Sequence, residues 1–116
     1  MAESKIKASN VVQWFEGTKS VASGGTASTL ATADTSDTNA YYLLIGSVAP
    51  HENTDANKQV QARLAGCIAR EPLRQAVSAV AVTTLKGNGS TRVLTTYHDY
   101  GSAIKLDYRY IVIKLN

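Results

Sequence analysis

The sequence predicts an all-β protein, a jelly-roll-like antiparallel β-sandwich of about eight short strands with a short N-terminal arm. Two observations favour this class. The chain is rich in Val, Ile, Thr and Tyr, which suit pleated and half-buried surfaces. Turn signals recur at intervals of roughly ten residues, and no segment has convincing helical amphipathicity. A chain of 116 residues is most simply one domain. We therefore divide it into an arm, residues 1–10, and a sandwich domain, residues 11–116.

The first third of the chain is expected to hold an arm, one clear strand and several short ones. Residues 1–10 are polar, and "NVVQWFEG" follows as the first strand. The segment 18–40 is dominated by Ser, Thr, Ala and Gly, so a disordered linker and extended structure are both open. We favour short strands, because Val21 and Leu30 bracket the doublet Gly24-Gly25, a hairpin signal between strands. The Asx-rich "ADTSDTN" is then a surface loop.

The remaining strands are expected between clear turn signals. "YYLLIGSVA" is a near-continuous apolar run, which predicts burial on both faces. "QVQARLAG" alternates, which predicts that Val60, Ala62 and Leu64 face inward and that Gln59, Gln61 and Arg63 face outward. Gly66 turns the chain into "CIAREPL", where Pro72 restricts the strand to an edge or an end. "QAVSAVAVTTL" is ambiguous, since its alanines tolerate a helix, but its β-branched residues favour a strand. "KGNGS" supplies a turn, and "TRVLTTYHDY" is the next strand.

The final strand, "LDYRYIVIKLN", is apolar on both of its faces. We expect Ile111, Ile113 and Leu115 to point into the sandwich. The opposite face is too apolar for water yet rich in tyrosine, which tolerates one wet end and is favoured at interfaces. We therefore predict a trimer interface on that face, formed by Leu106, Tyr108, Tyr110 and Val112.

Composition argues against several functional classes. The net charge of +3 is small and its Lys and Arg residues are scattered, which argues against a nucleic-acid-binding surface. The chain has a single cysteine, Cys67, so no intrachain disulfide is possible. The N-terminal residues lack the apolar core of a signal peptide, and no apolar run approaches the roughly 20 residues of a membrane helix. We expect a soluble protein made in a cytoplasm.

No catalytic or metal-binding constellation is apparent, and we expect neither enzyme activity nor a cofactor. His98 and Asp99 are neighbours, but in a strand they point to opposite faces, so we interpret them as a surface histidine and a turn-capping aspartate. His51, Glu52 and Asp55 form a weak metal candidate that is more simply a solvated loop. Cys67 has no signature of a nucleophile and is interpreted as a small, partly buried residue.

Five segments together resemble a modular β-sandwich of tailed-bacteriophage virion proteins. They are Tyr42–Ala49, Val60–Gly66, Val77–Gly89, Thr91–Tyr97 and Tyr110–Leu115. Such modules are similar to the tumour-necrosis-factor-like jelly roll, which usually assembles as a trimer. They occur as capsid decoration (cement) proteins and as receptor-binding heads or fibres. We favour decoration because the chain lacks the shaft sequence that normally precedes a fibre module.

The resemblance implies a homotrimer that binds the major capsid protein on the exterior of the virion, after synthesis in the host bacterial cytoplasm. Capsid contact is predicted for the arm and the start of the first strand, at Lys5, Ile6, Lys7, Trp14 and Phe15. Taken alone, Trp14 is better explained as the large core residue of a β-sandwich, so both readings of it are open. The alternative is a receptor- or glycan-binding head of a tail fibre or spike. Its site would combine Tyr97 and Tyr100 with the loop 51–57.

Overall fold

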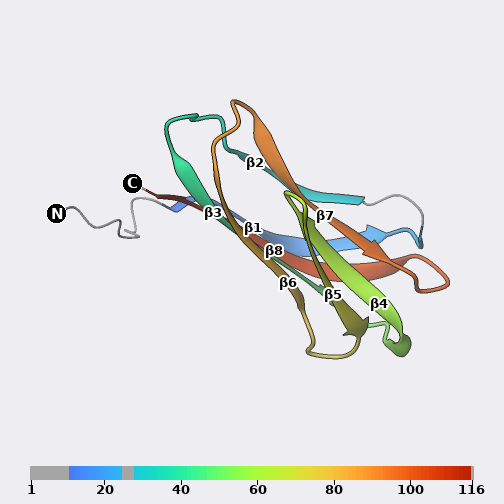
Figure 1. Cartoon of the computed structure of the whole chain (residues 1–116). Helices are drawn as coiled ribbons and strands as arrows, with labels where there is room; N and C mark the ends of the chain where they lie inside the picture. Colours follow the sequence, from blue (N-terminus) through green and yellow to red (C-terminus); the bar gives the residue numbers. More distant parts are fainter. Residues whose placement is uncertain (1–10, 25–27, 116) are drawn as a thin grey trace.

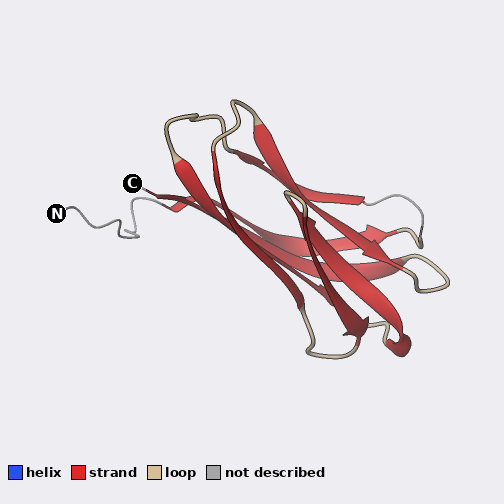
Figure 2. Cartoon of the chain, in the orientation of Figure 1, coloured by secondary structure: helices blue, strands red, loops and turns tan. Residues whose placement is uncertain are grey.

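The fold is a sandwich of two four-stranded antiparallel sheets (Figures 1 and 2). A computed structural model of the chain describes residues 11–24 and 28–115. Within these residues it contains β-strands and no helix. The strands are β1 (Val11–Val21), β2 (Ser28–Asp34), β3 (Tyr41–Pro50), β4 (Asp55–Leu64), β5 (Cys67–Leu73), β6 (Ala79–Lys86), β7 (Thr91–His98) and β8 (Ile104–Leu115).

The strand order is that of a jelly roll. Sheet A has the order β1-β8-β3-β6, and sheet B has the order β2-β7-β4-β5. Along the chain, only β4 and β5 are consecutive strands of one sheet, and each other connection passes from one sheet to the other. This is the double Greek key that a jelly roll requires. The fold class predicted from the sequence is confirmed.

Of the two hairpins predicted from glycine turn signals, the one at Gly66 is present and the one at Gly24-Gly25 is not. Ala65 and Gly66 both have positive φ, and Leu64 pairs directly with Cys67, so β4 and β5 form the predicted hairpin through a two-residue turn. Val21 and Leu30 do not flank a hairpin, because β1 lies in sheet A and β2 in sheet B. β1 and β2 are thus joined by a connection between the two sheets, and the local sequence cannot distinguish such a crossing from a hairpin.

The core lies between the sheets and is built from one residue parity per strand. Leu44 and Val48 of β3 meet Val60, Leu64 and the other inward side chains of sheet B, all of them fully buried. At roughly 25 cal/mol per Å² of apolar surface, each buried leucine or valine contributes on the order of 2 kcal/mol. The packing is close enough that a Cβ on Gly46 would lie 2.6 Å from a methyl carbon of Leu94.

The predicted orientation of β8 is wrong. Leu106, Tyr110 and Val112 are fully buried in the core, whereas Ile111 and Ile113 point outward and are partly exposed. The reason is that the inner face of sheet A needs large side chains to fill the sandwich. Tyr110 supplies one: its ring packs against Phe15 at 6.0 Å between centroids, and its hydroxyl donates to the Arg92 carbonyl at 3.1 Å.

The prediction that β3 is buried on both faces also needs correction. Its burial alternates: Tyr42 and Leu44 are buried, while Leu43 and Ile45 are only half-buried and lie on the outer face of sheet A. Both central strands of this sheet, β3 and β8, thus carry large aliphatic side chains on the side away from the core.

Candidate assembly surface

The outer face of sheet A carries a continuous set of apolar side chains, which we call the apolar face. Its central row crosses all four strands, because Trp14 pairs with Ile111, Ile111 with Ile45, and Ile45 with Val82. Directly paired residues of an antiparallel sheet point to the same side. A second row joins Ile113 to Leu43. The members of the apolar face are Trp14, Leu43, Ile45, Val80, Val82, Ile111 and Ile113.

The edges of the apolar face are its most exposed part. Trp14 on β1 is 56% exposed, and Val82 and Val80 on β6 are 52% and 48% exposed. Scattered exposed hydrophobic residues are normal on a soluble protein, but a contiguous apolar patch marks an interaction site. The register joins Trp14 to Val82 through Ile111 and Ile45, so these residues form one patch, and Val80 lies beside Val82 in the next row, opposite Ser47.

Charged residues border the apolar face at one end. Next to the central row along the strands, Glu16 pairs with Arg109, and the Arg109 Nε lies 3.3 Å from Glu16 Oε2. The Arg109 guanidinium also lies 5.9 Å from the centroid of the Trp14 ring. Beyond them Asp107 accepts hydrogen bonds from Thr18 and from the His51 ring. The apolar face therefore ends at a row of mutually paired charges.

The outer face of sheet B is different in character. A row across its strands joins Arg70, Gln61 and Tyr97. The Arg63 Nε donates to Gln61 Oε1 at 2.8 Å, and the Arg63 guanidinium lies 5.4 Å from the Tyr97 ring centroid. Gln61 is buried among these neighbours, and the face also carries two exposed apolar side chains, Ile68 and Val93. The two outer faces of the sandwich are thus chemically unequal.

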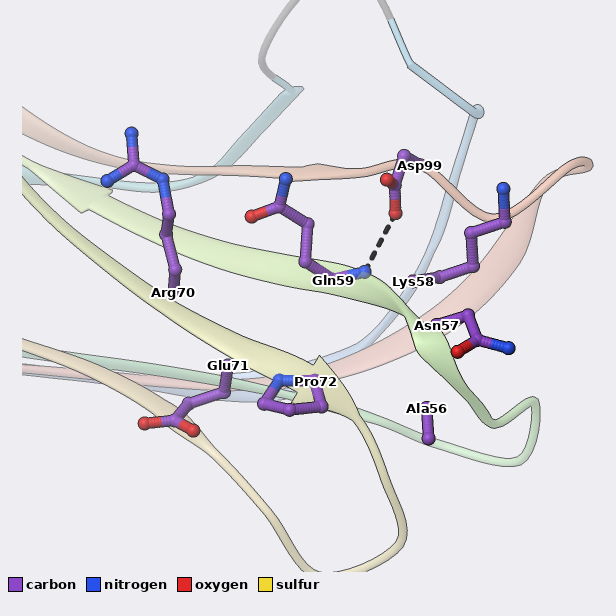
Figure 3. A pocket seen from close by; sticks show the side chains of 8 residues that line it. All are labelled: Ala56, Asn57, Lys58, Gln59, Arg70, Glu71, Pro72 and Asp99. Atoms are coloured by element: carbon purple, nitrogen blue, oxygen red, sulfur yellow. Dashed lines mark hydrogen bonds between the residues drawn. The ribbon is translucent and has the colours of Figure 1, made fainter.

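A hollow of about 390 Å³ opens where β4 separates from β5. The ladder passes from Asp55–Leu73 to Gln59–Pro72, which leaves residues 56–58 without partners on β5. In Figure 3, Asp99 accepts the Gln59 backbone N–H at 2.7 Å, while the Arg70 and Lys58 side chains extend away from each other. Lining groups of both signs and diverging side chains do not build a site for one charged ligand.

His98 and Asp99 lie apart, as the strand geometry predicted, but His98 is not on the surface. It is fully buried, and Asp99 is outside. The His98 Nδ1 accepts the Tyr100 backbone N–H at 3.2 Å, so the proton is on Nε2, which donates to the Val21 carbonyl at 2.8 Å. His98 thus links the end of β7 to the end of β1. From the sequence we had interpreted it as a surface histidine, so this structural role was not predicted.

The loop 51–57 does not form a metal site. His51 Nδ1 contacts Asp107 Oδ1 at 2.9 Å rather than Glu52 or Asp55. The Thr18 hydroxyl donates a hydrogen bond to the same carboxylate oxygen at 2.5 Å. It therefore contacts Asp107 rather than the His51 ring, unlike the nucleophile of a catalytic triad, which contacts the histidine. Within residues 11–24 and 28–115, no group of three His, Cys, Asp or Glu side chains is placed to hold a metal ion. Cys67 is half-buried against the core, as expected.

The predicted trimer-interface residues are distributed differently from the prediction. Leu106, Tyr110 and Val112 belong to the protomer core, and Tyr108 is half-buried beside Gly17. Burial raises the pKa of Tyr110 from 10.0 to about 12, because its ionised form would lose hydration. Leu106, Tyr110 and Val112 are therefore occupied within one chain, whereas Tyr108 is still partly accessible.

Among the predicted capsid-contact residues, Lys5, Ile6 and Lys7 lie outside the described residues. Trp14 is exposed, as a partner contact requires, whereas Phe15 points inward onto Tyr110. Sequence reasoning missed Leu43, Ile45, Val80 and Val82 as surface residues. The available signal was the absence of polar alternation in "YYLLIGSVA", which we interpreted as burial on both faces, while no face was assigned to Val80 and Val82 in "QAVSAVAVTTL".

No family model, curated protein or solved structure matches this chain. In the part of the chain that the structure describes, no helix has the length and apolarity to span a bilayer.

Proposed function

We propose that this protein is a structural virion component, a capsid decoration (cement) protein of a tailed bacteriophage that binds the major capsid lattice as a homotrimer. The observation that carries the proposal is the inequality of the two outer faces. The apolar side chains of sheet A form a row across all four strands and suit burial in an assembly, whereas the outer face of sheet B mixes Arg, Gln and Tyr side chains with the separate exposed residues Ile68 and Val93. The sequence resemblance to virion β-sandwich modules supplies the biological setting.

The mechanism is stabilisation by linkage. A protein that binds the assembled lattice but not free capsid subunits stabilises the assembled state by about 2.7 kcal/mol per site when its free concentration is 100 times Kd. Lattice contact is assigned to Lys5, Ile6 and Lys7, which precede β1 in the chain. Two lysines beside one large apolar residue suit a capsid surface that offers carboxylates around an apolar depression.

The test is co-sedimentation with particles assembled from the major capsid protein encoded nearest to this gene. We expect the protein to pellet with expanded particles at a fixed ratio and to raise their disruption temperature. The triple variant Lys5→Glu, Ile6→Ser, Lys7→Glu should stay in the supernatant, and Lys58→Glu on sheet B serves as the control for charge. Failure of the wild-type protein to pellet, or equal binding to unassembled capsid subunits, contradicts the proposal.

A receptor- or glycan-binding head is the second candidate, and the outer face of sheet B favours it. Tyr97 lies beside amide and guanidinium groups that offer donors and acceptors, next to the hollow between β4 and β5. Tyr100, the other predicted aromatic residue, packs against the core instead. A glycan array separates the candidates: sugar binding that Tyr97→Ala abolishes, without capsid binding, supports the receptor function.

A further inference from the structure

The outer face of sheet B carries two neighbouring arginines, Arg63 on β4 and Arg70 on β5. They are diagonal neighbours, because Arg70 pairs with Gln61, two residues from Arg63 on the same side of β4. In the part of the chain that the structure describes, the ion pairs join other residues. We propose that these arginines and the adjoining hollow between β4 and β5 bind an acidic glycan, one whose sugar carries a carboxylate or a sulfate group. This site deepens the second candidate function, glycan binding, and rests on it.

The Arg63 guanidinium is held in position before any ligand binds. Its Nε donates to Gln61 Oε1 at 2.8 Å, and its central carbon lies 5.4 Å from the centroid of the Tyr97 ring. Gln61 is only 4% exposed, so the fold fixes this acceptor. With Nε occupied, the two Nη groups remain to donate in parallel to both oxygens of an acidic group. A side chain that is already oriented loses little entropy when it binds such a group.

Arg70 supplies a second positive charge at the same place. Arg63 leans along β4 to reach Gln61, the residue that pairs with Arg70, so its guanidinium lies in the row of the sheet that contains Arg70. Figure 3 shows that the Arg70 side chain extends to the same side as Gln59, whereas the Glu71 carboxylate lies on the other side of β5. Like charges at neighbouring positions of a sheet repel each other, and an anion bound between them removes that repulsion.

The hollow beside Arg70 has the size and the lining for a sugar ring. Its volume of about 390 Å³ falls within the range of small-molecule sites. The amides of Asn57 and Gln59 donate and accept hydrogen bonds, as sugar hydroxyls require. Asp99 Oδ1 accepts the Gln59 backbone N–H, which leaves Oδ2 for a hydroxyl, and the Pro72 ring offers apolar surface to C–H groups. Lining groups of both signs thus suit a hydroxylated ring better than a single ion.

Arg70 belongs to both parts of the site. It lines the hollow, and it is the diagonal neighbour of Arg63 on the outer face. A sugar ring in the hollow, with its acidic substituent turned toward Arg70, therefore places the negative charge at two guanidinium groups. A nucleic-acid strand would instead bring its phosphates close to the carboxylates of Glu71 and Asp99, which line the same hollow. The mixed charges therefore favour a glycan over DNA or RNA.

Isothermal titration calorimetry with matched acidic and uncharged saccharides tests the inference. The probes are oligogalacturonate with its methyl ester, and dextran sulfate with dextran. We expect at least one acidic probe to bind, its uncharged counterpart not to bind, and the affinity to fall as salt is added. Arg70→Gln should weaken binding at least about tenfold, the effect of losing one charge-assisted hydrogen bond. Arg63→Lys keeps the charge but loses the paired donors, so it should weaken binding as well.

Lys86→Gln is the matched control, because it removes one exposed positive charge from sheet A. It should leave the affinity unchanged. Arg70 is exposed, so Arg70→Gln should melt at the wild-type temperature, which excludes unfolding as the cause of lost binding.

Equal weakening by Arg70→Gln and Lys86→Gln, or equal binding of single-stranded DNA, overturns the inference, because attraction would then follow net charge alone. Equal binding of the acidic and uncharged probes also overturns it, and glycan binding stands if Tyr97→Ala abolishes that binding. No binding of either acidic probe overturns the acidic-glycan site, whereas glycan binding itself is contradicted only if the glycan array is negative too.

Discussion

Replacing Tyr110 with phenylalanine tests the placement of this side chain in the core. At neutral pH the substitution removes the hydrogen bond from the hydroxyl to the Arg92 carbonyl, 3.1 Å long, while the ring stays in place. One such bond contributes about 1 kcal/mol, so we expect Tyr110→Phe to lower the free energy of unfolding by about that amount at pH 8.

At alkaline pH the difference in unfolding free energy between the wild type and Tyr110→Phe should disappear. The pKa of Tyr110 is raised from 10.0 to about 12, so the folded state retains the phenol proton at pH values where the unfolded chain has lost it. The contribution is fully present below pH 10 and is lost as pH rises through about 12. At pH 11 the wild-type protein should have lost about 1.4 kcal/mol through this residue. The phenylalanine variant has no such loss and should then be as stable as the wild type.

Urea denaturation at pH 8 and pH 11, at one protein concentration for both proteins, measures this difference. The other tyrosines titrate in both proteins and cancel in the comparison. If the difference in unfolding free energy between the two proteins is the same at both pH values, Tyr110 ionises freely in the folded state. The assignment of this residue to the core would then be wrong, and the interface predicted from the sequence would regain its basis.

Two further substitutions test the packing between the sheets. Gly46→Ala should destabilise the protein by about 1–3 kcal/mol, because its new Cβ would lie 2.6 Å from Leu94, and the cost should be less than additive with that of Leu94→Ala; full additivity in urea denaturation would contradict the close contact. His98→Ala should cost about 2–4 kcal/mol, because the Val21 carbonyl and the Tyr100 N–H lose their partner in the core; an unchanged melting temperature would show that water replaces the ring without cost.

The positions of the strands were predictable from the sequence because each is bounded by local turn chemistry. The hairpin at Gly66 is an example, since its turn residues act only on their immediate neighbours. The partner of a strand is not a local property. Val21 and Leu30 flank a glycine doublet as hairpin strands do, yet they enter different sheets, because the jelly roll is specified by contacts between residues distant in sequence.

The prediction of which side chains point into the core failed where both faces of a strand are apolar. In "QVQARL" the inward residues, Val60 and Leu64, differ clearly from their polar neighbours, and their burial was predicted correctly. In β8 both parities are apolar, so the choice depended on an argument about tyrosine. That argument treated the hydroxyl of Tyr110 as a group needing water, whereas the Arg92 carbonyl accepts its hydrogen bond inside the protomer.

The lack of contrast between the two faces is strongest in the central strands of sheet A. The outward positions of β4 in sheet B are Gln59, Gln61 and Arg63, so the sequence of this strand predicts one apolar and one polar face. β3 and β8, the central strands of sheet A, have isoleucine at paired outward positions, Ile45 and Ile111. Among residues 11–24 and 28–115 no element covers that side, and an antiparallel sheet with one solvated face normally carries polar residues there. Two-sided apolarity on neighbouring strands is therefore what the proposed assembly function predicts for sheet A.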